Sequence, residues 1–209
     1  MADVEFFFDP VCPWAWLTSR WMVNVMDERP MEVDWRFISL RIVNEERDYG
    51  KEVPADHERG HTRGLELLRV AAAVRKEVDP SAVLPLYSAL GHVIHEQAKP
   101  TAFDDPGELE RVLRELGLPT ELVAAAGGTE YDELIRAETE EALERCGGDI
   151  GTPVVSFAPP EGPSFFGPVV NRAPEGKEAV ELWDAVVTLG SNPHFSELKR
   201  ATRGSPELL

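Results

Sequence analysis

Strand-forming segments occur only near the two ends of this chain of 209 residues. Val4 to Phe8 is a short apolar run that ends at the turn signal Asp9-Pro10, which predicts a buried strand. A helix is expected to begin at Pro13 and to end near Arg29-Pro30. Apolar side chains then alternate with polar ones from Val33 to Phe37, which predicts a second strand. The chain therefore opens with the order β-α-β.

The middle of the chain has helical periodicity. Two apolar stripes, within Leu67–Val78 and Leu109–Leu116, recur at helical spacing. Between them, Ser81 is expected to cap a helix that runs to about Gln97. A capping box at Thr129-Asp132 opens a last helix. We expect four or five helices here and no strands.

Strand character returns after this helical segment. Pro153–Phe157 and Ser164–Phe166 are separated by a turn rich in proline and glycine, which predicts a hairpin, and an amphipathic helix over Ala179–Val187 follows. The order of elements is β-α-β, helical insertion, β-β-α. We therefore divide the chain into a core of residues 1–42 and 147–209 and an inserted helical subdomain of residues 43–146.

Composition excludes several classes of protein. The 38 acidic and 21 basic side chains give a net charge of -17, which would repel a nucleic-acid backbone or an anionic membrane surface. No run approaches the roughly 20 apolar residues of a membrane-spanning helix. The stretch Met1 to Glu5 lacks the features of an export signal, so we expect a cytoplasmic protein without nucleic-acid or membrane partners.

Cys12 is the candidate nucleophile. It stands immediately before Pro13, at or next to the N-cap of the first helix, where unpaired N–H groups and the helix dipole favour an anion. We expect its thiolate to be stabilised, with a thiol pKa below the free value of about 8.5. A lone cysteine is ordinarily a small buried hydrophobic residue, but the position of Cys12 favours the nucleophile.

The chain resembles the thioredoxin superfamily and, within it, the DsbA-like branch, in which a helical domain interrupts the core. Cys12-Pro13 at a helix start, Gly151-Thr152-Pro153 at a strand start, and the order of elements carry this resemblance. The fold class is therefore expected to be α/β, a DsbA-like thioredoxin fold with an inserted all-helical subdomain. Seven stretches resemble the mycothiol-dependent nitroreductase family: Phe8–Trp14, Thr18–Trp21, Ile94–Gln97, Gly151–Pro153, Phe165–Val169, Leu182–Ala185 and Pro193–Arg200.

The resemblance implies roles for individual residues. Cys12 would be the attacking thiol, and Thr152-Pro153 would be the cis-proline loop that faces it, with the Thr152 backbone pairing with a bound thiol or peptide. Trp14 would form a wall of the site, and the helical insertion would act as a lid. Mycothiol would be the co-substrate.

The chain departs from the family at one position. Members commonly carry Cys-Pro-Trp-Cys, whereas this chain has Cys12-Pro13-Trp14-Ala15. Alanine cannot resolve a mixed disulfide, so an internal disulfide cycle is excluded and a second small thiol must release the adduct. Ala15 is either natural, which we favour, or an engineered substitution that traps the adduct. Cys146 falls on an apolar helix face and is interpreted as a core cysteine rather than a resolving thiol.

The remaining candidate residues are polar side chains on predicted helices. His92 and His95 are three apart, but no further ligands complete a metal site, so we predict none. We expect His95 to be buried or to line the thiol-binding groove. We interpret His57 with His61, and the acidic tract Glu138–Glu144, as solvated helix faces.

Tryptophans and arginines supply the last candidates. Trp16, like Trp14, lies beside the thiol in sequence and is assigned to the site, and Arg20 and Arg200 are candidate contacts for an anionic thiol ligand. The other tryptophans have core spacing and are interpreted as packing residues: Trp21, Trp35 and Trp183.

Together these features suggest a thiol-disulfide oxidoreductase that uses Cys12 and mycothiol on small electrophilic or disulfide substrates, without a tightly bound cofactor. Two alternatives stay open. One is an enzyme similar to kappa-type glutathione transferases or the related isomerase, which activates a bound thiol and forms no disulfide with it. The other is a catalytically degenerate thioredoxin-fold protein that binds a ligand or partner in the same groove.

Overall fold

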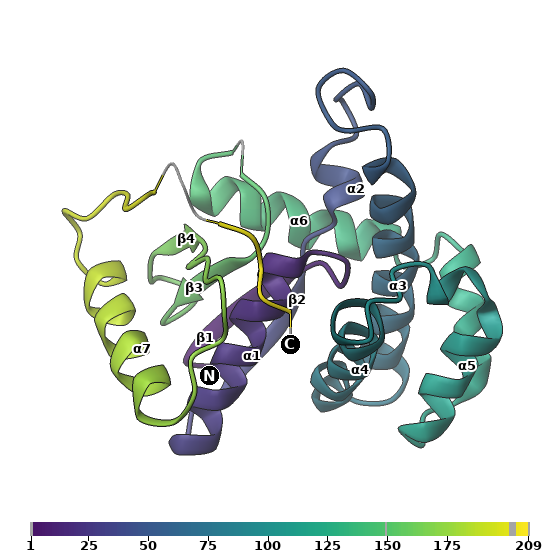
Figure 1. Cartoon of the computed structure of the whole chain (residues 1–209), viewed down its shortest axis with the longest axis horizontal. Coiled ribbons are helices and arrows are strands. Elements are labelled where there is room, and N and C mark those ends of the chain that lie inside the picture. Colours follow the sequence, from purple (N-terminus) through teal and green to yellow (C-terminus); the bar gives the residue numbers. More distant parts are fainter. Residues whose placement is uncertain (1, 149, 201–203, 209) are drawn as a thin grey trace. The chain divides into compact units, whose positions relative to one another are not determined.

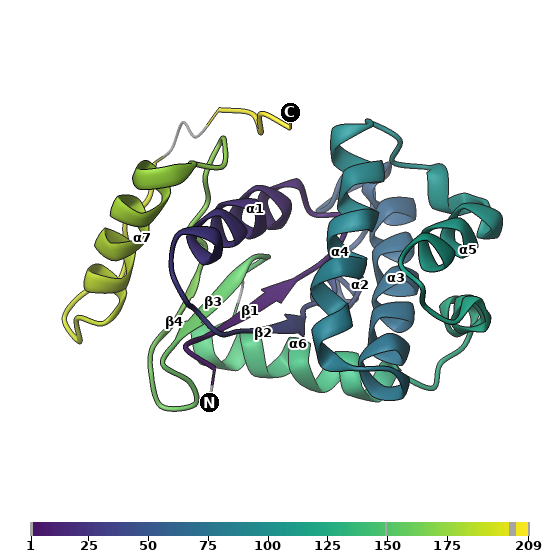
Figure 2. The ribbon, with the colours of Figure 1, turned by 90° about the horizontal axis from the view of Figure 1, so that it is seen from below.

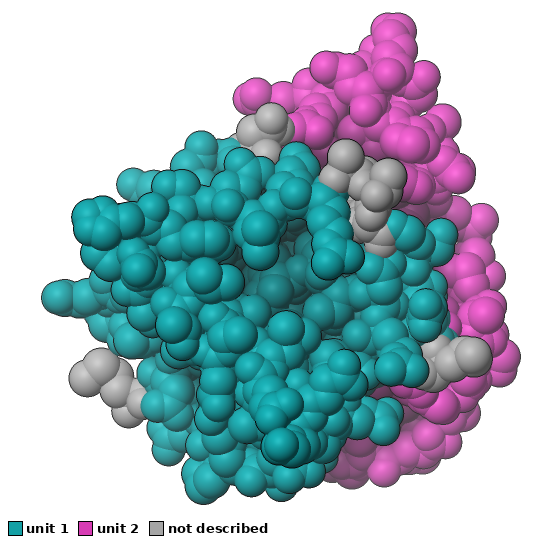
Figure 3. Space-filling view, turned by 60° about the vertical axis from the view of Figure 1, so that its left-hand side comes forward, with its two compact units in different colours: residues 1–8, 12–36, 142–209 teal, residues 9–11, 37–141 magenta. Residues whose placement is uncertain are grey.

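The computed structural model describes residues 2–148, 150–200 and 204–208. Their internal contacts divide the chain into two compact units, coloured separately in Figure 3. The first contains residues 1–8, 12–36 and 142–209, and the second contains residues 9–11 and 37–141. Two of these limits lie a few residues before the boundaries suggested by the sequence, and residues 9–11, which the sequence division placed in the core, fall in the second unit. The domain assignment stays a prediction.

The first unit is built around a four-stranded sheet in the order β2-β1-β3-β4. β1 pairs antiparallel with β3, and β3 pairs antiparallel with β4, which confirms the expected hairpin. Figure 1 shows these elements, whose bounds are β1 (Val4–Phe8), α1 (Pro13–Glu28), β2 (Val33–Phe37), β3 (Val154–Phe157), β4 (Ser164–Phe166) and α7 (Gly176–Gly190).

β1 is buried along its whole length, as its apolar run predicts. Phe6 and Phe8 lie on the same face of the strand, and their rings meet the ring of Trp35 on β2 edge-on, with centroids 5.2 and 6.3 Å away. Glu5 lies on the opposite face, because successive side chains of a strand alternate. A buried carboxylate there needs ionic and hydrogen-bonding partners.

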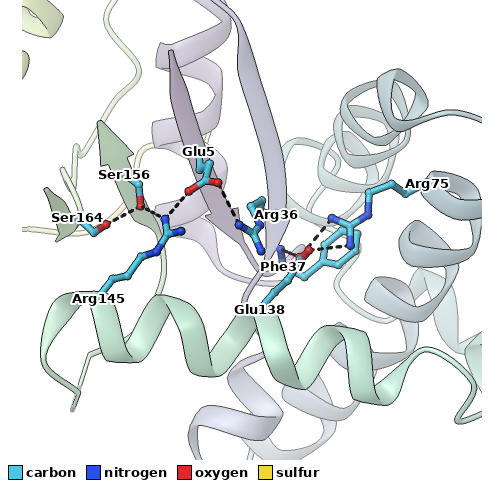
Figure 4. A network of polar contacts seen from close by, with 8 residues as sticks. All are labelled: Glu5, Arg36, Phe37, Arg75, Glu138, Arg145, Ser156 and Ser164. Atoms are coloured by element: carbon cyan, nitrogen blue, oxygen red, sulfur yellow. Dashed lines mark hydrogen bonds and ion pairs between the residues drawn. The ribbon is translucent and has the colours of Figure 1, made fainter. Parts of the chain in front are cut away.

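Glu5 is paired with two arginines (Figure 4). Arg36 of β2 donates to one carboxylate oxygen at 3.0 Å, and Arg145 donates to the other. Arg145 also donates to Ser156 Oγ at 3.2 Å, and Ser156 lies 2.6 Å from Ser164 Oγ. Removing one partner would leave a buried charge uncompensated, so each arginine is needed to keep Glu5 paired in the interior.

α1 covers one face of the sheet, as Figure 2 shows, and packs against α7. The Trp21 indole donates to the carbonyl of Ala179 at 2.9 Å, and its ring lies edge-on to Trp183, with centroids 5.7 Å apart. Trp35 is buried as well. The interpretation of these three tryptophans as packing residues is therefore confirmed.

The second unit is helical. Its long helix α3 buries the predicted stripe from Leu67 to Val74, while Val78 is 44% exposed because the helix has already ended at Glu77. The regular elements are α2 (Leu40–Val43), α3 (His57–Glu77), η1 (Pro80–Ala82), α4 (Val83–Gly91), η2 (His92–Glu96), η3 (Ala102–Asp104), α5 (Pro106–Glu115), η4 (Thr120–Gly127) and α6 (Asp132–Cys146), whose last turn belongs to the first unit. None of the helices in the described ranges combines the length and the apolar character needed to cross a bilayer.

Two details of the helical segment differ from expectation. Asp79, not Ser81, caps the helical stretch before α4: its carboxylate accepts the Ser81 N–H at 2.8 Å. Glu138 was expected on a solvated face, yet it is 9% exposed. It accepts the Phe37 N–H at 2.9 Å and pairs with Arg75 at 2.8 Å (Figure 4). Arg75 lies on α3, 63 residues from Glu138 in the chain, so the spacing of residues around Glu138 could not reveal this ion pair.

Candidate functional site

Cys12 is the N-cap residue of α1, as its place before Pro13 predicts. Its backbone is extended and its carbonyl accepts the Trp16 N–H at 3.0 Å, which begins the helix. Cys12 as a residue is 5% exposed, and its thiol makes no cap hydrogen bond to the helix. It donates instead to the carbonyl of Thr152, with a sulfur–oxygen distance of 3.4 Å. Because a thiolate has no proton to donate, ionisation of Cys12 must break this contact.

Thr152 and Pro153 form the loop that faces Cys12 within the first unit. The peptide bond between them is cis, as the resemblance implies. The Thr152 hydroxyl donates to the carbonyl of Phe7 at 3.3 Å, and the Pro153 carbonyl accepts the Gly167 N–H at 2.8 Å. The loop is therefore anchored on both sides, to β1 and to the end of β4. The structure thus brings together two segments 140 residues apart in the chain.

A second loop is anchored to α1 close to this site. The Thr18 hydroxyl, which is fully buried, donates to the carbonyl of Pro168 at 2.8 Å. Gly167 precedes that proline with φ of 97°, and an added Cβ would lie 3.0 Å from the Val169 nitrogen. A residue other than glycine would be strained here. Thr18 and the Gly167-Pro168 step both lie in stretches that resemble the family.

The first turn of α1 places the motif residues at different depths. Trp14 is half-buried, whereas Ala15 is fully buried. Trp16 is 2% exposed, and the Arg20 guanidinium lies over its ring, 4.2 Å from the centroid. Trp14 is therefore the tryptophan of this turn that solvent reaches most readily, while contacts of Trp16 and Arg20 with a ligand stay predictions. Arg200 is exposed.

Asp9 is a residue whose importance sequence reasoning missed, since it was taken only as a turn signal. Its carboxylate is completely buried in the second unit and accepts the Val11 N–H at 3.1 Å and the Leu40 N–H at 2.8 Å. Burial raises the pKa of Asp9 to about 7, although both N–H donors favour the ionised form and lower it. The signal that could have drawn attention to it is an Asp-Pro pair directly after a fully apolar strand.

His95 belongs to the second unit and contacts the same segment as Asp9. It is 6% exposed, and its Nε2 donates to the carbonyl of Pro10 at 2.9 Å. Burial lowers the pKa of His95 to about 4, so the ring is neutral near pH 7. This confirms the expectation of a buried histidine, and a contact between His95 and a thiol ligand stays a prediction.

The other histidines differ in exposure. His92 is exposed, and its Nδ1 lies 2.6 Å from Glu96 Oε2. Within the described residues, no group of three side chains is placed to hold a metal ion. His61 was expected on a solvated face, but it is half-buried beside Tyr49, whose hydroxyl lies 2.9 Å from its Nδ1. Burial, with the nearby charges of His57 and Arg41, lowers the pKa of His61 to about 4.

Both cysteines of the chain carry thiols rather than a disulfide. Cys146, at the end of α6, is half-buried rather than deep in the core. Burial raises the pKa of its thiol to about 11, which leaves little thiolate near neutral pH. Cys146 is therefore a poor nucleophile near neutral pH.

Comparison with known proteins identifies the family. A sequence profile described as Rv2466c-like, mycothiol-dependent nitroreductase Rv2466c, matches residues 11–200. This chain belongs to that family. It is 33% identical over 203 residues to the uncharacterized protein Rv2286c of Mycobacterium tuberculosis (strain ATCC 25618 / H37Rv), covering 96% of this chain and 82% of that protein. The expected family resemblance is confirmed, and the chain is, in the broad sense, a thiol-dependent oxidoreductase.

Solved structures show the same fold. The probable DsbA oxidoreductase SCO1869 from Streptomyces coelicolor superimposes with a TM-score of 0.59 at 15% identity, over 96% of this chain and 94% of that one. A 2-hydroxychromene-2-carboxylate isomerase gives a TM-score of 0.57 at 13% identity, over 88% and 94%. Identities this low show the fold alone, and they confirm an α/β thioredoxin-like fold with a helical insertion.

Proposed function

We propose that this protein is a monothiol thiol-disulfide oxidoreductase that uses Cys12 as nucleophile and mycothiol as co-substrate. The observation that carries the proposal is the position of the Cys12 thiol. It lies at the start of α1, against the carbonyl that precedes Pro153, in a chain of the mycothiol-dependent family. A helix start favours the thiolate that attack requires, because the helix dipole stabilises an anion there.

The proposed cycle balances with small thiols alone. The Cys12 thiolate attacks a substrate disulfide, a new sulfur–sulfur bond forms, and one half of the substrate leaves as a thiolate. A mycothiol thiolate then attacks the mixed disulfide and releases Cys12, and a second mycothiol thiolate completes reduction of the substrate. The net reaction converts one substrate disulfide and two mycothiol molecules into two substrate thiols and one oxidised mycothiol.

Ala15 supports a monothiol cycle. It stands at the position where the family resemblance implies a second cysteine, and it is fully buried. An intramolecular resolving step therefore has no thiol at this position, and release must come from a small thiol. We assign the binding of that thiol to Thr152, Pro153 and Trp14, with Trp16 and His95 as further candidate contacts, and the acceptor to small electrophilic or disulfide compounds.

The test is the intact mass of the full chain after incubation with oxidised mycothiol and, separately, with oxidised glutathione. We expect one mycothiol adduct, none with glutathione, and reversal by reduced mycothiol. Cys12→Ser is the matched control that must carry no adduct, and Cys146→Ser must carry it as the unchanged chain does. An adduct that persists in Cys12→Ser would overturn the assignment of the nucleophile.

Absence of any adduct from the folded chain would instead favour one of the two alternatives. A transferase- or isomerase-type enzyme would turn over a thiol substrate without covalent modification of Cys12. A binding protein would show neither turnover nor covalent modification of Cys12. The variant Ala15→Cys identifies this case, because it would gain a disulfide reductase activity that the unchanged chain lacks.

A further inference from the structure

The segment Asp9–Val11 leads directly into Cys12, and its backbone is held from three directions within the second unit. Asp9 Oδ1 accepts the Val11 N–H, and Oδ2 accepts the Leu40 N–H at the start of α2. The Pro10 carbonyl between them accepts from His95. Three consecutive residues thus take part in hydrogen bonds that fix the path of the chain up to the peptide bond joining Val11 to Cys12.

The packing around Asp9 is as specific as its hydrogen bonds. Gly64 of α3 lies against the carboxylate: a Cβ at position 64 would be 2.5 Å from Oδ1 and 3.0 Å from Oδ2 of Asp9. No real Cβ contact is as short as the first, so only glycine leaves room for the carboxylate. α3 therefore has a glycine, without a side chain, at the position that lies against the Asp9 carboxylate.

The chain contains two other Asp-Pro pairs, Asp79-Pro80 and Asp105-Pro106, and both differ from Asp9-Pro10. The Asp79 carboxylate accepts the Ser81 N–H at 2.8 Å, and that of Asp105 accepts the Gly107 N–H at 2.9 Å. In both, the aspartate is exposed and the helical turn begins at the proline. At Asp9 the same turn is completely buried, Oδ2 has a partner on α2, and the helix begins only at Pro13.

We propose that Asp9 is a positioning residue for Cys12: its ionised carboxylate fixes the segment Asp9–Val11, and protonation loosens the hold on Leu40. The inference rests on the proposed function, because it gives Asp9 a role in the reactivity of that nucleophile. Each carboxylate oxygen accepts one N–H, so a proton on Oδ2 removes acceptor capacity where Leu40 donates. Cys12 would then react differently above and below the pH at which Asp9 ionises.

The charged residues next to Leu40 and Gly64 have partners other than Asp9. Arg41, next to Leu40, lies over the ring of Tyr49. Arg63, next to Gly64, pairs with Glu66 and Asp104. His95 has a pKa lowered to about 4 by burial and remains neutral where Asp9 titrates, with a pKa of about 7. A step in reactivity near neutral pH can therefore be assigned to Asp9 or to the Cys12 thiol itself.

The experiment measures the rate of Cys12 alkylation by iodoacetamide against pH, in the full chain carrying Cys146→Ser so that mass reports Cys12 alone. Thiolate absorbance on the same samples locates the ionisation of Cys12. We expect an additional step near pH 7 that is lost in Asp9→Asn and kept in the matched control Asp105→Asn. Above pH 7 we expect Asp9→Asn to alkylate several-fold faster, because the loosened segment exposes a thiol that is otherwise 5% exposed.

A profile of Asp9→Asn that coincides with the unchanged chain, or no step beyond thiolate formation, would overturn the proposal. If Asp9→Asn does not fold, Asp9→Ser takes its place, since serine keeps an acceptor for Val11 and removes the titrating group. Iodoacetamide needs no mycothiol. The result for Asp9 therefore stands even if the mass experiment fails to show a mycothiol adduct and the proposed function falls.

Discussion

Two helices of this protein, α1 and α5, begin alike, with an N-cap residue followed by proline, yet they use the N-cap differently. At α5 the Asp105 carboxylate accepts the Gly107 N–H and so satisfies a backbone donor of its own helix. At α1 the Cys12 side chain makes no cap hydrogen bond, and its thiol donates to Thr152. The same local arrangement therefore satisfies a backbone donor of its own helix at α5, whereas at α1 the side chain of the proposed nucleophile bonds to a residue outside its helix.

The segments that lead into the two helices differ in the same way. α5 follows the short turn η3, whose Asp104 pairs at the surface with Arg59 and Arg63. α1 follows a buried segment held by Asp9 and His95. A surface turn needs only to start a helix, whereas a turn that leads into the proposed nucleophile must also fix the position of that residue. The predictions below test this contrast.

The largest effect is expected from Cys12→Ser, which makes the start of α1 resemble that of α5. A serine hydroxyl can cap the helix and still donate to Thr152, so we expect the free energy of unfolding to stay the same or to rise by up to about 1 kcal/mol. Thiol-dependent turnover should fall by at least about a thousandfold, since the nucleophile is gone. Chemical denaturation and steady-state kinetics on one preparation measure both, and retained turnover would contradict the assignment.

The next largest effect concerns the pH dependence of stability at Asp9 compared with Asp105. The pKa of Asp9 is raised from 3.8 to about 7, so the folded state holds its proton more tightly than the unfolded chain. Its contribution is present in full below pH 3.8 and is lost as the pH rises to about 7, by roughly 4 kcal/mol in total. Denaturant titrations of Asp9→Asn should lack this decline, and those of Asp105→Asn should keep it. Parallel curves for the unchanged chain and Asp9→Asn would contradict the raised pKa.

The effect of His95 on stability should have the opposite pH dependence over part of the same pH range. Its pKa is lowered from 6.5 to about 4, so the neutral ring contributes stability above pH 6.5 that is lost as the pH falls to about 4, by roughly 3 kcal/mol. His95→Gln keeps an N–H donor for the Pro10 carbonyl but does not titrate, so this acid-side loss should vanish. Thermal unfolding at a series of pH values measures it, with the exposed His92→Gln as control.

The smallest effect is expected at Asp105, the N-cap residue of α5, where we expect the cap hydrogen bond to contribute to stability alone. Asp105→Ala removes the acceptor for Gly107 and should lower the free energy of unfolding by about 1 kcal/mol, with no change in the rate of Cys12 alkylation. Denaturation and alkylation of the same variant test both halves. A change in Cys12 reactivity would remove the distinction drawn between the two helix starts.

Much of the fold could be predicted from the sequence because its local signals agree with the tertiary structure. β1, α1, β2 and the β3–β4 hairpin lie where apolar period, proline and turn residues place them. Cys12 could also be placed at the N-cap from Pro13 alone. These features depend on residues near one another in the chain, so local pattern suffices.

The misjudged side chains were polar ones whose burial or hydrogen-bond partner could not be predicted from helical spacing or cap preference. Glu138 has the spacing of a solvated residue, but Arg75 and the Phe37 N–H make it a buried one. Cap preference suggested Ser81, where Asp79 two residues earlier accepts the hydrogen bond. Burial and partner choice are properties of the packed chain, and helical period alone does not determine them.

The sequence by itself determined the order of elements and the family, and it singled out Cys12 as the candidate nucleophile, because each of these depends on residues near one another in the chain. Only the tertiary structure decided what surrounds them. It placed the Thr152 carbonyl against the Cys12 thiol across 140 residues of chain, and it buried Asp9 between Leu40 and Gly64. Burial raises the pKa of Asp9, and this effect could not be predicted from the adjacent proline, since desolvation depends on everything that packs around the carboxyl group.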